Sequence, residues 1–200
     1  MKYTIRRVKK GAVDFSKAET AVVAHYDWCG DYRPRVEAQI LFEEGTGFHL
    51  RMTAWESVTR AVHTQHNAMV CEDSCMEWFV DFAPAAGVGY INFEMNPRGT
   101  SYMAVGQARG ERRFLQELVP IPPVEAKQQS DRWTVQLFVP LSLIDAIYGA
   151  QTFAPGTRLK GNFYKCGDET AQKHYGMWQP ITWHKADFHR PEQFGDFVME

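Results

Sequence analysis

The sequence has few cysteines, no long apolar run and no excess of either charge. Its formal net charge of −2 over 200 residues gives no basic field for nucleic acid, and no apolar stretch could cross a bilayer. The basic start, MKYTIRRVKK, lacks the apolar segment that follows in a signal peptide. We therefore expect a cytoplasmic protein, and an extracellular one only if an upstream segment has been removed.

The cysteines are Cys29, Cys71, Cys75 and Cys166. They are too few and too scattered for a disulfide framework, and without an export signal we expect reduced thiols. His63 and His66 precede Cys71 and Cys75, but this spacing matches no common zinc finger. Loop histidines and buried thiols are the better interpretation, and no zinc is predicted there.

The short motifs of several enzyme classes are also missing. The chain contains no GxSxG, Walker loop, GxGxxG or HExxH, which are the signatures of serine hydrolases, nucleotide-binding proteins and zinc proteases. It has no internal repeat, low-complexity tract or heptad pattern. An enzyme is therefore the weaker hypothesis, and no catalytic residue is assigned.

What the chain does contain is short alternating segments separated by glycine and proline. Apolar and polar residues alternate over 36–42 and 48–54 around the turn at 43–47, and again over 133–139. Pro140 ends the last segment, and Ser142 is the expected N-cap of a short helix. The pattern predicts one all-β domain over residues 1–200, an antiparallel β-sandwich of immunoglobulin-like or jelly-roll type with short helices in its connections.

The stretch 70–100 carries the most informative polar residues. Alternation over 76–82 and 90–95 predicts two paired strands, and a shared apolar face puts Glu77 opposite Glu94. Facing carboxylates repel unless a cation, an arginine or a hydrogen-bonding ligand lies between them. The alternative is an ordinary solvated sheet face, and a register error of one residue would remove the opposition.

Sugar binding needs the kinds of side chain that occur here. An aromatic ring stacks on the apolar face of a pyranose, while carboxylates, amides and basic groups bind its hydroxyls. Glu77, Asn92 and Glu94 share one predicted face, and aromatic residues crowd the C-terminal loops beside His189 and Arg190. These parts favour an oligosaccharide or polysaccharide partner.

Five motifs in order extend this interpretation: EDSCMEWFVD, YINFEMNPRGT, WTVQLFVPLSL, KGNFYKCGD and HRPEQFGDF. From about Pro34 to the C-terminus the chain resembles the family 9 carbohydrate-binding modules and their DOMON-like relatives. The resemblance implies a β-sandwich, and the founding members bind the ends of glucan and xylan chains between two tryptophans. It implies a non-catalytic module that binds a plant-type glucan, such as cellulose, or a xylan-derived oligosaccharide in carbohydrate catabolism.

The family's site transfers only in part. By position, the resemblance places Glu77 on a sugar-contacting acid, Asn92 where the family has a basic contact, and Phe188 on one clamp tryptophan. The second clamp position falls near Val70 or Cys71, and neither is aromatic. The ligand-binding residues that we predict are Glu77, Asn92, Glu94, Lys165, Trp178, Phe188 and Arg190.

The sequence does not identify the second aromatic ring of a sugar clamp, a metal site or the oligomeric state. Trp55, Trp178 or Trp183 would have to supply the second ring, although Trp178 and Phe188 could equally be core residues. Members of the family often carry calcium, but its usual acidic turn is not recognisable here, so calcium and any other metal are undecided. The oligomeric state is also undecided.

Two alternatives belong to other functional classes. A glycoside hydrolase-associated, xylanase-like protein could use Glu77, Asp81 and Glu94, because glycosidase carboxylates lie roughly 5 to 9 Å apart. A haem-binding DOMON-like domain would need a Met and His pair. The chain has seven histidines and eight methionines, but no spacing selects such a pair.

Overall fold

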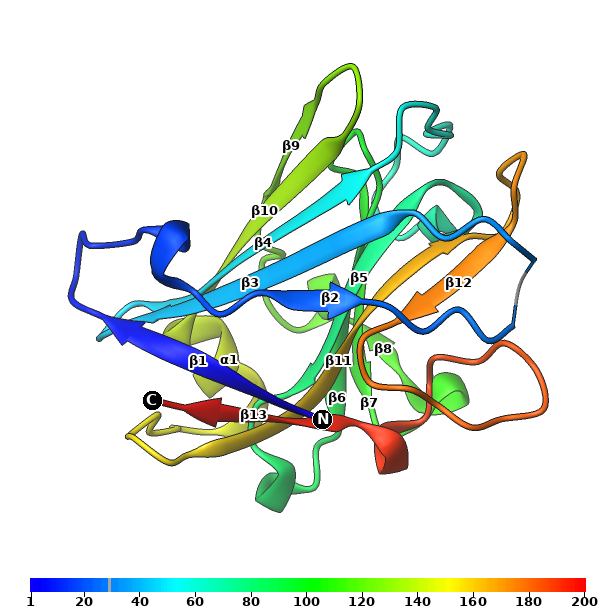
Figure 1. Cartoon of the computed structure of the whole chain (residues 1–200). Helices are drawn as coiled ribbons and strands as arrows, with labels where there is room; N and C mark the ends of the chain where they lie inside the picture. Colours follow the sequence, from blue (N-terminus) through cyan, green and yellow to red (C-terminus); the bar gives the residue numbers. More distant parts are fainter. Residues whose placement is uncertain (29) are drawn as a thin grey trace.

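The computed structural model describes residues 1–28 and 30–200, so Cys29 and its expected free thiol lie outside the described residues. Its strands form one continuous hydrogen-bonded path that folds into two layers (Figure 1). The first layer contains, in spatial order, β8 (Arg113–Phe114), β7 (Ser101–Gly106), β6 (Tyr90–Met95), β5 (Cys75–Asp81), β11 (Arg158–Gly167), β13 (Gly195–Met199) and β1 (Lys2–Val8), with β12 (His174–Met177) paired to β11. The second continues from β1 through β3 (Arg35–Glu43), β4 (Gly47–Trp55), β10 (Trp133–Pro140) and β9 (Val124–Gln128), with β2 (Ala21–Val23) paired to β3.

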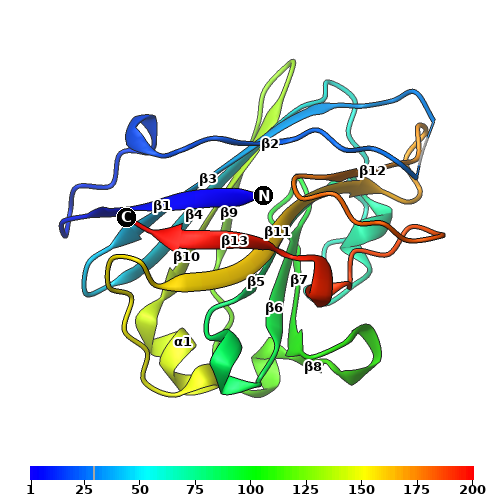
Figure 2. The ribbon, with the colours of Figure 1, turned by 60° about the horizontal axis from the view of Figure 1, so that its bottom comes forward.

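Strand β1 joins the two layers and departs from the predicted antiparallel pattern. Its first half pairs in parallel with β13, and its second half pairs in parallel with β3. The first and last strands of the chain therefore lie side by side, as the adjacent blue and red strands in Figure 2 show. The other paired strands of the described chain are antiparallel, so the predicted β-sandwich is confirmed with this one addition.

The main core lies between the layers and follows directly from the alternation in the sequence. Trp78 of β5 stacks on Phe93 of β6, with ring centroids 5.5 Å apart, and both are fully buried. From the other layer, Leu50 of β4 and Val135 of β10 belong to the same core. Burying a large apolar side chain stabilises the fold by about 1.5–3 kcal/mol, which fixes the face that each strand presents.

Helical structure is confined to connections. Helix α1 (Leu141–Tyr148) follows β10 without a break, so Pro140 is its N-cap and the predicted N-cap at Ser142 is wrong. The Leu141 N–H donates to the Thr46 carbonyl, which holds the first helical residue against the β3–β4 turn. The 3-10 turns are η1 (Phe15–Lys17), η2 (Val70–Glu72), η3 (Pro84–Ala86), η4 (Arg109–Glu111), η5 (Leu115–Glu117) and η6 (Pro191–Gln193). No helix in the described chain has the length and apolar character to span a membrane.

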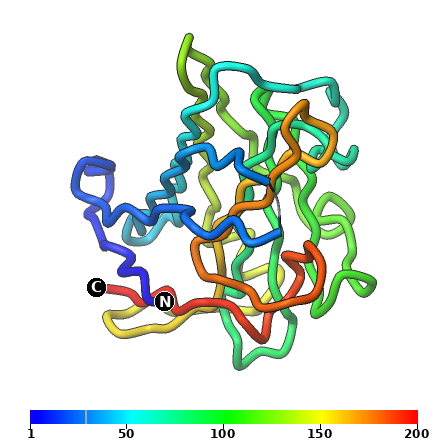
Figure 3. The backbone as a smooth tube through the Cα atoms, turned by 45° about the vertical axis from the view of Figure 1, so that its right-hand side comes forward, coloured from blue at the N-terminus to red at the C-terminus, as the bar shows by residue number. Residues whose placement is uncertain are grey.

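A second apolar layer covers the outer face of the first sheet. Phe79, Tyr90 and Tyr164 point away from the main core and pack against residues of the segment between β12 and β13, including Phe188. Figure 3 shows this segment as a broad loop. The outer face of β5, β6 and β11 is therefore partly roofed, and polar side chains at the edge of the roof lie in a recess.

Candidate functional site

The β5–β6 hairpin has the register that the sequence predicts. Glu77 pairs with Glu94, and Phe79 pairs with Asn92. Strand β11 lies on the other side of β5, where Tyr164 is opposite Glu77. Both acids therefore belong to the outer face, side by side.

The two carboxyl groups are far less solvated than an open sheet face would allow. Only 2% of Glu77 and 6% of Glu94 is exposed. Burial, and then the neighbouring Glu94, raise the pKa of Glu77 well above its usual value. Burial also raises the pKa of Glu94, to about 7, although Arg112 and Arg109 oppose this. The pair favours a ligand that donates hydrogen bonds to it.

Arg112 and Asn92 hold Glu94 in place from one side. The Asn92 Nδ2 donates to Glu94 Oε1 at 2.9 Å, and Arg112 Nη1 donates to Asn92 Oδ1 at 2.8 Å. The same Arg112 nitrogen lies 3.9 Å from Glu94 Oε1. Asn92 therefore lies on the predicted face of the sheet, but it is fully buried and contacts the arginine and the acid, and the basic group comes from the residue that follows η4.

A pocket of about 190 Å³ opens above the two acids. We call it the Glu77 pocket. Its lining includes Cys71, Glu77, Glu94, Tyr102, Arg109, Arg112, Cys166, Asp168, Tyr175 and Phe188. The acids lie at its floor because they project from the central strands, and loop residues supply most of the walls. Acceptors, donors and rings thus surround a single small space.

Two tyrosines that the sequence did not single out flank the acids. Tyr102 comes from β7 and Tyr175 from β12, and the strand order β7-β6-β5-β11-β12 places them on opposite sides of Glu77. Both are partly exposed and line the Glu77 pocket. Arg112 lies over the Tyr102 ring, with its Cζ 5.5 Å from the centroid.

Phe188 also lines the pocket but is mainly a packing residue. Its ring stacks on Tyr164 with centroids 4.1 Å apart and an angle of 10° between the planes, and only 7% of the residue is exposed. Arg190 does not line the pocket. Its guanidinium lies over the Trp183 ring, 3.5 Å from the centroid, and it pairs with Asp187 at 2.9 Å.

Lys165 and Trp178, which we also predicted in the site, lie elsewhere. Residues next to each other in a strand face opposite ways, so Lys165 points inward while Cys166 faces the pocket. The Lys165 Nζ is fully buried, 2.6 Å from His174 Nε2 and 3.3 Å from a Glu56 carboxylate oxygen. Trp178 is 3% exposed and packs in the main core on Phe197.

The other tryptophans considered for a second ring are not part of this pocket. Trp55 belongs to the second sheet, where Arg35 lies over its ring at 4.7 Å. Trp183 is 38% exposed, carries the Arg190 guanidinium over its ring and does not line the pocket. The two tyrosines are therefore the rings best placed to flank a ligand above Glu77.

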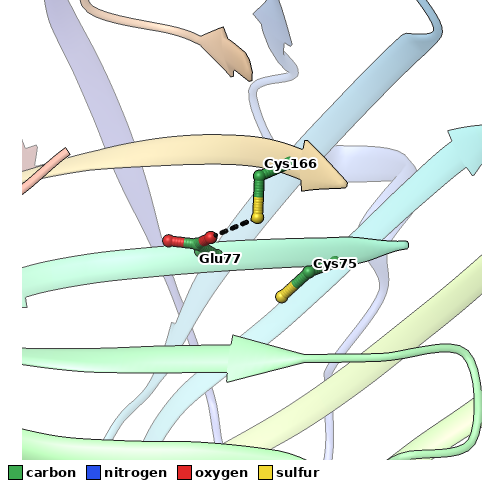
Figure 4. A group of neighbouring side chains, drawn as sticks. All are labelled: Cys75, Glu77 and Cys166. Carbon is green, nitrogen blue, oxygen red and sulfur yellow. Dashed lines mark hydrogen bonds between the residues drawn. The ribbon is translucent and has the colours of Figure 1, made fainter. Parts of the chain in front are cut away.

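Metal ligands gather at one place in the described part of the chain. Cys75, Glu77 and Cys166 offer two sulfurs and a carboxylate oxygen within 4.8 Å of one another (Figure 4). His63 instead contacts a Glu72 carboxylate oxygen at 2.9 Å, and His66 contacts the Ser101 hydroxyl at 3.0 Å. Calcium, which the sequence left undecided, is assigned to no residue of the described chain.

Comparison with known proteins identifies the family. The sequence model described as carbohydrate-binding family 9 matches residues 8–199. This chain belongs to carbohydrate-binding family 9. A putative carbohydrate-binding protein from Bacteroides uniformis ATCC 8492 is 25% identical, with a TM-score of 0.81 over 100% of this chain and 99% of the other. No curated protein gives a match.

Two further structures share the fold of this family 9 chain at lower identity. Both are family 9 carbohydrate-binding modules from Caldicellulosiruptor kristjanssonii. The one in complex with cellotriose is 11% identical with a TM-score of 0.69, covering 100% of this chain and 94% of the other. The one in complex with glucose is 12% identical with a TM-score of 0.71, covering 100% and 96%.

Proposed function

We propose that this family 9 chain is a non-catalytic module that binds the end of a glucan or a xylan-derived oligosaccharide in the Glu77 pocket. The observation that carries the proposal is the pair of facing, buried carboxyl groups at the floor of a pocket beside Arg112. The bound cellotriose and glucose of the Caldicellulosiruptor modules support this class of ligand.

The chemistry of the pocket matches the hydroxyl pattern of a sugar. Sugar hydroxyls donate to Glu77 and Glu94, which replaces the water that these acids lose on burial. Arg112 donates to a hydroxyl or ring oxygen, and the flanking tyrosine rings contact the C–H faces of the pyranose. Since the ligand stabilises the charged carboxylates, binding offsets the cost of holding them side by side.

The depth of the acids supports binding of a chain end. Only a small part of Glu77 and Glu94 is exposed, at the floor of the pocket, and strands β5, β6 and β11 close the pocket from below. A terminal sugar can insert several hydroxyls into such a recess, whereas a sugar within a long chain carries a glycosidic link on both sides. We therefore expect oligosaccharides and chain ends to bind better than uninterrupted polymer.

Calorimetric and tryptophan-fluorescence titration with glucose, cellobiose, cellotriose and xylobiose tests this function. We expect one site per chain for at least one of these sugars. Glu77→Gln should remove binding, while Glu125→Gln, on the exposed edge strand β9 of the second layer, should retain it. No response to any of these sugars at millimolar concentration would contradict the proposal.

Incubation with xylan and aryl glycosides separates binding from catalysis. A binding module releases no reducing ends, so we expect none above a blank without protein. Release that disappears in Glu77→Gln would instead assign glycoside hydrolysis to the same acids.

A further inference from the structure

Two thiols and a carboxyl group meet beneath the Glu77 pocket. The β5–β11 register pairs Cys75 directly with Cys166, and Glu77 lies two residues further along β5 on the same face. The Cys166 Sγ donates to Glu77 Oε1 at 2.8 Å, the contact drawn in Figure 4. All three are almost completely buried, and both thiols are free.

We propose that Cys75, Glu77 and Cys166 form a binding site for Zn²⁺. Thiolate and carboxylate are established zinc ligands, and two sulfurs with one oxygen favour zinc over the hard ions calcium and magnesium. Zinc to sulfur bonds of about 2.3 Å in a tetrahedron place neighbouring ligand atoms roughly 3.5–4 Å apart. The ligand atoms of this cluster already lie within 4.8 Å of one another, so small side-chain rotations are enough.

The pocket gives the ion a route in and leaves one position of the tetrahedron open. Glu77 and Cys166 line the pocket, while Cys75 lies behind them against the neighbouring strand. As the metal bonds to each sulfur, the thiol proton passes to solvent, and the charge of the ion offsets the two thiolates formed. A water or a sugar hydroxyl completes the tetrahedron from the pocket side.

Packing of small buried cysteines explains the positions of the two thiols but not the buried carboxyl group beside them. Burying an acid without a cation is unfavourable, and Arg112 contacts Glu94 on the far side of the pair from Cys166. A Zn²⁺ ion coordinated by Glu77 and the two sulfurs would bond directly to the carboxylate oxygen, while its two positive charges balance the two thiolates. The site does not depend on sugar binding and can be tested without any sugar.

Zinc binding is measured on the full chain, reduced with a phosphine, stripped with a chelator and dialysed against Zn²⁺. We expect one ion per chain, and Co²⁺ should give thiolate charge-transfer absorption. Loss of an outer-shell partner alone costs roughly 10–100-fold in metal affinity, so Cys75→Ser and Cys166→Ser should each lose at least about 100-fold. Cys71→Ser is the matched control, since Cys71 is a free thiol on η2 that lines the same pocket but is not one of the three proposed ligands.

Three results would overturn the site: no zinc on the wild-type chain, zinc retained at full affinity by folded Cys75→Ser, or zinc lost in folded Cys71→Ser. Far-ultraviolet circular dichroism checks folding, and if a variant misfolds, a Co²⁺-loaded wild-type chain without thiolate charge-transfer absorption overturns the site. If the chain binds cellotriose but no zinc, only the zinc site fails. If it binds zinc but no sugar, only the proposed function fails.

Discussion

Glu77 and Glu94 lie directly opposite each other in the β5–β6 ladder, and both are almost completely buried. Such a pair opposes folding as soon as both groups are charged, because each charge is poorly solvated and close to its like. The sheet keeps them in this arrangement through the apolar residues on its other face, including Trp78 and Phe93. The two facing carboxyl groups therefore destabilise the fold at the place where we propose that sugar binds.

This arrangement predicts an inverse pH dependence of stability in the metal-free chain. The pKa of Glu94 is raised from 4.5 to about 7, so the folded state holds more protons than the unfolded state between these values. The contribution of Glu94 to the free energy of unfolding should therefore fall by about 1–3 kcal/mol as the pH rises from 4.5 to 7, opposed over part of this range by His174 and His189. Urea unfolding with a chelator present measures it. Glu94→Gln should flatten this dependence, and an unchanged slope would contradict the assignment.

Arg112 and its neighbour Arg113 form a matched pair for testing the cation beside Glu94. Arg112→Ala removes the donor to Asn92 Oδ1 and should lower the free energy of unfolding by about 1–3 kcal/mol and abolish cellotriose binding. Arg113 has a side chain that is 64% exposed, so Arg113→Ala should change stability by less than about 0.5 kcal/mol. Chemical unfolding and calorimetry report both, and equal effects of the two variants would refute the role of Arg112.

Tyr175 and Phe188 line the same pocket, but we expect substitution of Tyr175 to affect mainly sugar affinity and substitution of Phe188 to affect mainly stability. Phe188→Ala leaves a cavity against Tyr164 and should lower the free energy of unfolding by about 3–5 kcal/mol. Tyr175→Ala should instead weaken cellotriose binding roughly 2–10-fold with a smaller effect on stability. Tyr175→Phe keeps the ring and should retain most of the affinity. Unchanged affinity in Tyr175→Ala would remove this ring from the sugar site.

His174 predicts the opposite pH dependence on the acid side. Burial, and then Lys165, lower the pKa of His174 from 6.5 to about 4, so the unfolded state binds more protons between these values. Its contribution of about 1–3 kcal/mol is present above pH 6.5 and should be lost as the pH falls toward 4. Unfolding between pH 4 and 7 checks this.

His189 contributes in the same direction, since burial lowers its pKa to about 2. His174→Gln should therefore reduce, but not abolish, the histidine contribution by which the free energy of unfolding rises between pH 4 and 6.5. His184→Gln is the control, because His184 is exposed and should leave the slope as it is. A slope in His174→Gln equal to that of the wild type would show that the group does not titrate as described.

The sequence predicted the hairpin and its register because alternation constrains both strands at once. Glu77 could be placed opposite Glu94 only because the apolar sets of β5 and β6 must share one core. Strand β1 was missed, although Tyr3 and Ile5 alternate with polar residues, since its charged start was considered only as a leader. Its parallel partners are distant in sequence, and no local pattern specifies them.

Side-chain contributions from loops and from less regular strands were harder to predict. Arg112 follows a 3-10 turn, and nothing in its neighbourhood of the sequence shows that it reaches Asn92. Lys165 was assigned to the pocket without a strand pairing for β11, and the register turns it to the inner face. The alternation of Tyr164 and Cys166 around it was the available signal. Which of these side chains reach the pocket depends on tertiary contacts, and the periodicity of the sequence does not specify those contacts.

A crystal structure of the chain with cellotriose tests the central claim most directly. We expect the terminal sugar in the Glu77 pocket, with its hydroxyls within hydrogen-bond distance of the Glu77 and Glu94 carboxylates and Arg112 beside it. A sugar bound on the second sheet near Trp55, with the Glu77 pocket holding only water, would contradict the account.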